Sequence, residues 1–455
     1  MTDPAFPSLR QATAVWARIA LLSFGGPAGQ IAVMHRILVQ ERRWLGDGRF
    51  LHALNFCMVL PGPEAMQLAT YIGWLMHGVR GALIAGGLFI LPGVISILAL
   101  SWVYAIWGQV SLVAAIFLGL KAAVLAIVVQ AVIRLSRRAL RSRAAWGIAI
   151  AALIAIMALR VPFPVVIAAA ALIGLIGAQA GWRAFQTGGG GGHGTAAATV
   201  EDAATLLGDD STPPPGARRA ATRAGIIALI AWLAPVAALL IWRGPGDVFA
   251  DLALFFSKMA VLTFGGAYAV LAWVAQEAVA THGWLRPGEM LDGLGMAETT
   301  PGPLIMVLQF VGFMAALRGA GWDQALWAGT LGGLLTTWVT FLPCFALIFL
   351  GAPHMEALRQ NRAIAAALSA VTAAVVGVIA NLAIWFALHV IWTKVQTHQI
   401  GPLRLDLPVP GSLDPAAAGL AVLAMVAVFG LRMGVASVLA ISAAAGLALH
   451  LAGLA

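Results

Sequence analysis

Residues 16–26 of the chain read WARIALLSFGG, and residues 256–266 read FSKMAVLTFGG. The two stretches are 240 positions apart (256 − 16), and the same separation relates the tripeptides PGP at 61–63 and 301–303. Several matches at one ungapped offset indicate an internal duplication, in which the second half of the chain repeats the first.

The composition of the chain excludes a soluble protein. Of its 455 residues, 61% are hydrophobic and only 10% are charged, with a mean hydropathy of +0.93. A soluble domain carries about 25% charged residues. The sequence therefore predicts an all-α polytopic membrane protein whose helices contact the lipid bilayer. We interpret the net charge of +9 as charge that sets membrane topology, and expect no nucleic-acid partner.

Apolar runs that predict membrane spans lie on both sides of a polar segment at 183–222. The runs are 12–34, 50–76, 80–108, 112–134, 144–160, 162–180, 223–242, 249–275, 288–316, 322–352, 362–392, 415–432 and 434–453. Glycine and proline runs in the polar segment predict a flexible linker. The predicted organisation is a first repeat at 1–182, the linker at 183–222, an extra transmembrane helix at 223–243 and a second repeat at 244–455. We expect the short runs around Pro162 and Pro164 to form a tight hairpin.

Six spans precede the linker and one extra span follows it, so the second repeat is predicted to lie upside down relative to the first. Basic clusters at 134–143 and 218–223 agree with this scheme, because cytoplasmic loops collect Lys and Arg. The basic cluster at 36–49 disagrees. Two explanations stay open: the run 12–34 is re-entrant, or the charge rule fails there.

The FGG and PGP tripeptides predict breaks in helices at membrane depth. Proline removes a backbone donor, and glycine lets the chain reverse. Such breaks persist only where they are buried or line a cavity. Each leaves free N–H groups and the positive end of a dipole at the next half-helix, which favours anion binding. The alternative is a packing kink, but the duplication of both motifs favours a functional site.

Three cations inside apolar runs are candidates for anion binding. Arg18 and Lys258 each lie seven residues before the middle glycine of FGG, Gly25 or Gly265, so each shares a helix face with it. The alternative for both is snorkelling toward the headgroups. Lys121 is a weaker candidate because the second repeat has no cation at the matching position.

Two carboxylates are candidates for proton coupling. Glu64 directly follows the first PGP, where a carboxylate at a helix start is favourable, so capping is its alternative role. Glu298 lies three residues before Pro301, near the end of the preceding half-helix. There the dipole and the apolar surroundings disfavour a charge, which suits proton exchange.

Hydroxyl and amide groups flank the breaks. Thr299 and Thr300 precede the second PGP and offer donors to a substrate, whereas the first repeat has no hydroxyl there. Asn55, Gln67 and Gln309 are weaker candidates, because a membrane amide often only bridges helices. We find no nucleotide motif, metal signature or Ser/His/Asp pattern, and therefore expect no cofactor and no enzyme.

Residues 18–63 and 258–303 resemble the two signature blocks of the chromate ion transporter (CHR) family. The matching elements are LLSFGGPAGQIAVMHR, ERRWL and LPGPEAMQLATYIG in the first block, and VLTFGGAYAVL, GWL and TTPGPL in the second. In the first block, the residues that resemble the family's are Arg18, Gly25, Gly26, Pro61, Gly62, Pro63 and Glu64. Those of the second block are Lys258, Gly265, Gly266, Pro301, Gly302 and Pro303. One departure is Glu277, which lies seven residues before Trp284 instead of next to GW.

The resemblance implies the family's long, two-domain form, an inner-membrane antiporter-like carrier that expels chromate and also handles sulfate. We expect an oxyanion between the breaks and secondary transport driven by an ion gradient. The alternatives are a carrier of sulfate or another oxyanion and, less favoured, an anion channel. The sequence does not fix the oligomeric state, and a homodimer is one assembly considered.

Overall fold

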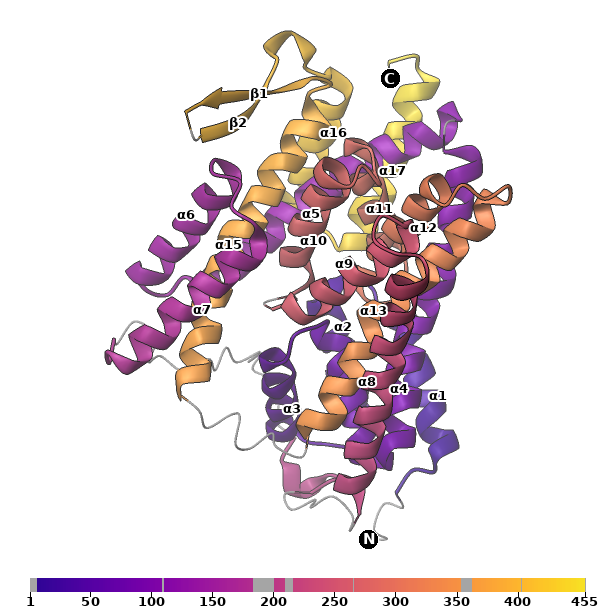
Figure 1. Ribbon diagram of the computed structural model, residues 1–455, viewed down its shortest axis with the longest axis vertical. Coiled ribbons are helices and arrows are strands. Elements are labelled where there is room, and N and C mark those ends of the chain that lie inside the picture. Colours follow the sequence, from indigo (N-terminus) through magenta and orange to yellow (C-terminus); the bar gives the residue numbers. More distant parts are fainter. Residues whose placement is uncertain are drawn as a thin grey trace. The chain divides into compact units, whose positions relative to one another are not determined.

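The computed structural model describes residues 6–108, 110–182, 200–208, 216–264, 266–352, 362–401 and 403–454, and most of them are helical (Figure 1). The elements before the linker are α1 (Leu9–Leu22), α2 (Gly26–His35), the π-helix η1 (Arg36–Glu41), α3 (Asp47–Val59), α4 (Glu64–Trp107), α5 (Ser111–Ala139), α6 (Arg143–Met157) and α7 (Phe163–Gln179). A 3₁₀ turn, η3 (Asp202–Ala204), and the helix α8 (Ala217–Trp242) follow. The helices α6 and α7 contact each other across the turn at Pro162, as expected for the predicted hairpin, and α8 covers most of the predicted extra helix at 223–243, which stays a prediction as a separate unit.

The second half begins with α9 (Val248–Leu262), α10 (Ala267–Gln276), the π-helix η4 (Glu277–Thr281), α11 (Pro287–Thr299), the 3₁₀ turn η5 (Leu304–Met306), α12 (Val307–Gly319) and α13 (Ala325–Gly351). It continues with α15 (Arg362–Ile391), the strands β1 (Val395–Ile400) and β2 (Leu403–Pro408), the 3₁₀ turn η7 (Pro410–Ser412), α16 (Pro415–Met425), the π-helix η8 (Val426–Gly430) and α17 (Val435–Leu451). The antiparallel hairpin of β1 and β2 occupies the segment between two predicted apolar runs.

The order of elements repeats in the two halves. The series α1, α2, η1 and α3 recurs as α9, α10, η4 and α11, including the short π-helix. The bounds of α3 and α11 differ by 240 positions at both ends (287 − 47 and 299 − 59). The kink in α4 at His77 and Gly78 corresponds to the turn between α12 and α13. The duplication read from the sequence is therefore a duplication of structure.

Four apolar runs predicted as single spans are interrupted. The runs at 12–34 and 249–275 break at FGG, and those at 50–76 and 288–316 break at PGP. With 14 residues in α1 and 10 in α2, each half is shorter than the ~20 residues that cross a bilayer. The two half-helices can together form a broken span or a re-entrant segment, so both explanations for 12–34 stay open. The opposite orientation of the two repeats stays a prediction.

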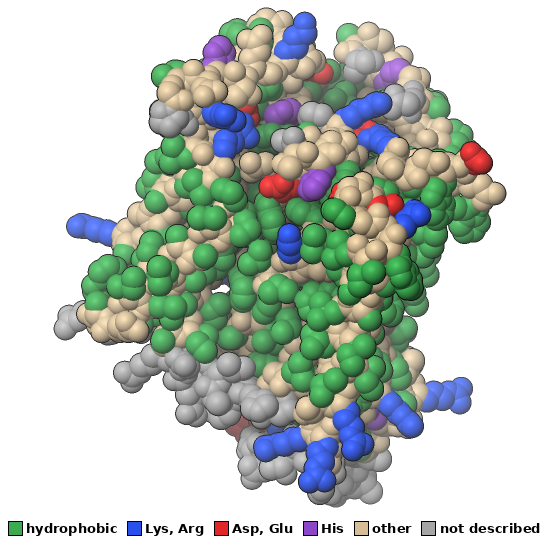
Figure 2. All heavy atoms as spheres, in the orientation of Figure 1, with side chains coloured by type: hydrophobic (Ala, Val, Ile, Leu, Met, Phe, Trp, Pro, Cys, Tyr) green, Lys and Arg blue, Asp and Glu red, His purple; other side chains and the backbone are tan. Residues whose placement is uncertain are grey.

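The described residues contain five helices that are long and apolar enough to cross a membrane alone: α4, α5, α8, α13 and α15. Large hydrophobic side chains lie exposed along these helices, such as Ile227 and Ile230 of α8. On the face in Figure 2, hydrophobic side chains cover much of the surface, and Lys and Arg side chains are few among them. Exposed apolar surface on this scale is typical of lipid contact, so the chain is a multi-pass membrane protein.

The chain forms two compact units, and each unit takes segments from both repeats. Unit 1 consists of Met1–Leu98, Gly190–Ala267 and Thr300–Gln360. Unit 2 consists of Ala99–Gly189, Tyr268–Thr299 and Asn361–Ala455. Neither unit coincides with a repeat. The domain boundaries predicted from the sequence follow the duplication and not the packing of the helices. Those boundaries stay a prediction.

Unit 1 is packed around α13, which contacts α8, α9 and α12. Small residues allow the closest approach: a Cβ at Gly332 of α13 would lie 2.5 Å from the carbonyl oxygen of Gly312 on α12. An indole N–H group adds a polar contact: that of Trp232 on α8 donates to the hydroxyl of Ser257 on α9 at 3.0 Å. Close backbones and a few buried hydrogen bonds are typical of helix packing in membranes.

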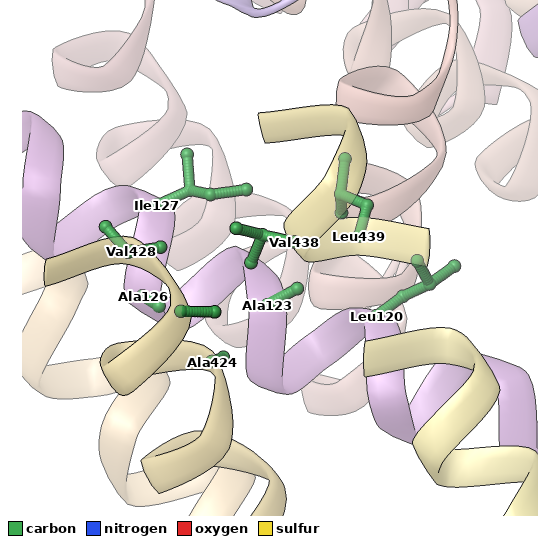
Figure 3. Packing of buried hydrophobic residues seen from close by; sticks show 9 residues of the cluster. Leu120, Ala123, Ala126, Ile127, Ala424, Val428, Val438 and Leu439 are labelled. Atoms are coloured by element: carbon green, nitrogen blue, oxygen red, sulfur yellow. The ribbon is translucent and has the colours of Figure 1, made fainter. Parts of the chain in front are cut away.

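Unit 2 is packed around α5 and α15. In Figure 3, four residues of α5 (Leu120, Ala123, Ala126 and Ile127) face Ala424 and Val428 from the α16–η8 segment and Val438 and Leu439 from α17. The helix α15 lies against α5, α6 and α7. An ion pair of 2.7 Å between Arg160 and Asp406 joins the α6–α7 turn to the β-hairpin.

Part of the predicted flexible linker is docked on the loop before α3. Residues 183–199 and 209–215 lie outside the described residues, but 200–208 are placed. The backbone N–H of Val200 donates to Asp47 at 2.6 Å, and that of Arg49 donates to Asp202 at 3.1 Å. The Arg49 side chain donates to the carbonyls of Leu207 and Gly208. Residues 200–208 are thus held against the first repeat, whereas the linker as a whole stays a prediction.

We expect Asp202→Ala to loosen the docked segment by removing one of its hydrogen bonds, the one from the backbone N–H of Arg49. A hydrogen bond to a charged group contributes ~1.5 kcal/mol or more, so cleavage after Glu201 by a Glu-specific protease should become about tenfold faster. The measurement is limited proteolysis of the purified protein. Asp323→Ala, at an exposed acid elsewhere, is the matched control and should leave the rate unchanged. Equal rates for Asp202→Ala and the unmodified protein would rule out this contact as the anchor.

Candidate functional site

Within unit 1, the PGP loop of each repeat contacts the FGG break of the other repeat. The backbone N–H of Gly62 donates to the carbonyl of Thr263 at 2.8 Å, and that of Gly302 donates to the carbonyl of Ser23 at 2.9 Å. Both donors and both acceptors are 240 positions apart (302 − 62 and 263 − 23). The two hydrogen bonds are therefore one contact made twice by the duplication.

The local sequence explains why these carbonyls are available. Ser23 and Thr263 end their helices, and each hydroxyl donates back to the carbonyl four residues earlier, on Ile19 or Met259, at 2.7 Å. A side chain that satisfies the last helical turn leaves the residue's own carbonyl for another partner. The loop glycines then approach with φ of 127° at Gly62 and 114° at Gly302, a region open to glycine.

The PGP loops are tightly packed. A Cβ at Gly62 would lie 2.7 Å from the side-chain nitrogen of Gln67 and 2.8 Å from Sγ of Cys344. A Cβ at Gly302 would lie 3.1 Å from Cα of Gly93. Alanine therefore does not fit either loop without movement of its neighbours.

The sequence predicted that the backbone N–H groups at the breaks have no hydrogen-bond partner. The N–H groups of Gly62 and Gly302 do have one. Both donate to protein carbonyls, because the two repeats bring a break and a loop together. The start of α2 keeps the predicted character: its N-cap, Gly25, has a φ of 77° and makes no side-chain hydrogen bond to the helix. Gly26 and Gly266 also have positive φ, whereas Gly265 lies outside the described residues.

The two predicted cations differ in their surroundings. Arg18 lies 2.9 Å from the carboxylate of Glu41, and both side chains are partly exposed. Lys258 is exposed and makes no ion pair within the described ranges. The position that matches Glu41 in the second repeat is Thr281, which is why the two cations are not equivalent.

The two predicted acids occupy different units. Glu64 is the first residue of α4, half-buried beside the first PGP in unit 1, a position compatible with both of its predicted roles. Glu298 is 4% exposed near the end of α11 in unit 2. Its Oε1 accepts a hydrogen bond from the hydroxyl of Tyr268 at 2.7 Å, and its Oε2 accepts none from the described residues. Tyr268 was missed in the sequence, although it is one of only three tyrosines.

The remaining polar candidates mostly bridge backbone. Gln67 donates to the carbonyl of Pro61 at 2.7 Å, and Gln309 donates to that of Val94 at 2.9 Å. The hydroxyl of Thr299 donates to Met296 in its own helix at 2.8 Å. Thr300 is buried in unit 1. Half-buried Asn55 lies on α3, with no hydrogen bond given for its side chain among the described residues.

The structure thus gathers most predicted residues in unit 1. The members there are Arg18, Gly25, Gly26, Asn55, Pro61, Gly62, Pro63, Glu64, Gln67, Lys258, Gly266, Thr300, Pro301, Gly302, Pro303 and Gln309. Lys121, Glu298 and Thr299 belong to unit 2. A duplicated helical fold whose broken helices meet in pairs is the construction of many secondary transporters. Fold and site together define a membrane transporter.

Comparison with known sequences gives the family. A family model described as "Chromate transporter" matches residues 10–175 and 250–448, which include both breaks of both repeats. The chain therefore belongs to the chromate transporter family.

Curated relatives agree over most of their length. A "Chromate transport protein" of Pseudomonas aeruginosa is 33% identical over 380 residues, covering 82% of this chain and 79% of that protein. A "Chromate transport protein" of Cupriavidus metallidurans is 27% identical over 389 residues, or 85% and 84% of the two chains. A "Probable chromate transport protein" of Synechococcus elongatus is 27% identical over 380 residues, or 83% and 84%. No solved structure matches the chain.

Proposed function

We propose that this chain exports chromate across the cell inner membrane by ion-gradient-driven secondary transport. The observation that carries the proposal is the reciprocal contact of Gly62 with Thr263 and of Gly302 with Ser23, which gathers the breaks of both repeats in unit 1. Helix starts gathered in this way present several partial positive charges to one anion. The names of the relatives indicate the substrate, chromate, which is a tetrahedral dianion.

In this proposal the anion binds beside the FGG and PGP breaks. The first turns of the half-helices, from Gly26 and Glu64 onward, supply backbone donors that the reciprocal contacts do not use. Lys258 offsets the charge of the dianion directly, whereas Arg18 must first leave Glu41. The driving force is an ion gradient or exchange, because the sequence contains no nucleotide motif.

The test is chromate uptake into inverted membrane vesicles, with and without an uncoupler, over a series of sulfate concentrations. Saturable, uncoupler-sensitive uptake that sulfate inhibits is expected for an energy-linked dianion carrier. Sulfate uptake without chromate uptake would replace the proposal with a sulfate carrier. An ohmic current without trans-stimulation by internal anion would replace it with a channel.

Glu298 is the proposed proton-coupling residue, and Glu298→Gln should uncouple transport. A buried carboxyl that has one oxygen without a hydrogen-bond partner can take up and release a proton, whereas an amide cannot. We expect uncoupler-sensitive accumulation to fall about tenfold or more while chromate–sulfate exchange continues. Asp323→Asn, at an exposed acid of unit 1, is the control and should retain accumulation. Unchanged accumulation in Glu298→Gln would leave Glu64 as the remaining candidate.

A further inference from the structure

A second polar site lies in unit 2, around the cation that the sequence left without a partner. The ammonium nitrogen of Lys121 on α5 lies 3.2 Å from Oδ1 of Asp292 on α11. The hydroxyl of Tyr104, near the end of α4, donates to Oδ2 of the same carboxylate at 2.8 Å. One carboxylate is thus held by a cation on one oxygen and a hydroxyl donor on the other.

The ion pair of Lys121 and Asp292 lies mostly out of solvent, so a change in the charge of one side chain strongly affects the other. The Asp292 side chain is 6% exposed and that of Lys121 is 24% exposed. Removing one member of a buried ion pair leaves the other uncompensated, which is strongly unfavourable. Loss of the negative charge on Asp292 therefore leaves the ammonium of Lys121 without its carboxylate partner and able to pair with another anion.

A proton can be accommodated on Asp292. Its Oδ1 lies within ion-pair distance of Lys121 but accepts no hydrogen bond in the described part of the chain. Glu289, also buried, lies one helical turn earlier on α11. Like charges one turn apart repel, and a proton on Asp292 relieves that repulsion. Lys121, Tyr104 and Glu289 are the charged and titratable groups that act on Asp292 among the described residues.

The pair is also close to solvent. A Cβ at Gly288 would lie 3.2 Å from the ammonium nitrogen of Lys121. Gly288 lines an open pocket of about 560 Å³ in unit 2, together with His389, Trp392, Thr393, Lys394, Val395 and Gln396. Water and small anions in the pocket are therefore separated from the ion pair only by Gly288. The pocket lining includes one histidine, His389, and one lysine, Lys394.

We propose that Asp292 binds a proton and that Lys121 is shared between the Asp292 carboxylate and an oxyanion from this pocket. With Asp292 ionised, the ammonium is held by the carboxylate. When water delivers a proton to Oδ1, the ion pair opens and the ammonium binds a tetrahedral dianion; loss of the proton reverses the exchange. The identity of the anion rests on the proposed function, but the site belongs to unit 2 and is additional to the FGG and PGP breaks.

The test measures sulfate binding to the purified full-length protein. At each pH from about 5.5 to 8, the quantity read is the increase in unfolding temperature that sulfate causes. The unmodified protein should bind sulfate about tenfold more tightly at the acidic end, because protonation frees the ammonium. In Asp292→Asn this tight binding should persist at every pH, and in Lys121→Gln it should be lost. Asp323→Asn, at an exposed acid of unit 1, should behave like the unmodified protein.

The double variant Lys121→Gln/Asp292→Asn carries no unpaired charge and covers the case in which a single variant fails to fold. It should bind sulfate weakly and without pH dependence. If Asp292→Asn or the double variant keeps the pH dependence of the unmodified protein, the inference is wrong. Chromate uptake into vesicles by the unmodified protein distinguishes a failure of this inference from a failure of the proposed function. If the variants keep the pH dependence and the unmodified protein takes up chromate, only the role of Asp292 and Lys121 is wrong. If the unmodified protein takes up no oxyanion, the proposed transport function is wrong.

Discussion

Gly302→Ala is expected to reduce chromate uptake at least about tenfold while the protein remains in the membrane. A residue with a side chain at a φ of 114° costs ~1–3 kcal/mol, and its Cβ would also press on Gly93 at 3.1 Å. The loop must move, and its N–H then loses the carbonyl of Ser23. Because ~1.4 kcal/mol corresponds to a factor of ten, the strain alone accounts for a loss of this size. Gly62→Ala should have the same effect through Thr263.

The control for these variants is Gly87→Ala in α4. Gly87 has no neighbour within 4 Å of an added Cβ and no positive φ, and alanine favours helix. Uptake is measured in inverted vesicles and normalised to the amount of transporter protein. If Gly302→Ala transports as well as Gly87→Ala, the reciprocal contact is only a packing feature and the proposed site loses its main support.

Lys258→Ala is expected to abolish saturable chromate export, with a loss of about a hundredfold. Removing the partner of a desolvated anion costs ~2–5 kcal/mol. Arg18→Ala should lose less, because Arg18 is paired with Glu41 when no anion is bound and gives up that contact to bind one. Lys258→Arg keeps the charge and should retain part of the flux.

Arg243→Ala is the matched control for Lys258→Ala. Arg243 is exposed and pairs with Asp247 one turn away, a surface contact worth little. Vesicle uptake and the affinity for chromate are measured for both variants. Export by Lys258→Ala at the level of Arg243→Ala would show that this lysine only snorkels to the headgroups.

Features that depend on local sequence could be predicted. Proline and glycine end helices by their own backbone preferences, so the breaks at FGG and PGP are found at 23–25 and 60–63 as predicted. The 240-residue offset revealed the duplication because no insertion separates the matched blocks. Hydropathy alone shows 12–34 and 249–275 as continuous runs, because it averages over the breaks that the FGG tripeptides predict.

Features that depend on distant residues could not be predicted. Lys121 and Asp292 are 171 positions apart (292 − 121), in different repeats, and the second repeat has no matching cation to suggest the pair. The docked segment at 200–208 is held largely through backbone carbonyls, which every residue carries. Tyr268 on α10 and Glu298 on α11 are 30 positions apart (298 − 268), and no local pattern in the sequence indicates that their side chains meet.

The interleaving of the two units has a consequence for biosynthesis. Unit 1 needs residues 300–360 as well as residues 1–98, so the ribosome must add about 260 residues after Leu98 before that unit is complete. At ~5–20 residues per second this takes about 15–50 s. Gly302 is added about 200 residues after Leu98 (302 − 98), so its hydrogen bond to the carbonyl of Ser23 forms late in synthesis. A stop codon after the linker would therefore leave unit 1 without residues 300–360, which include its second PGP loop.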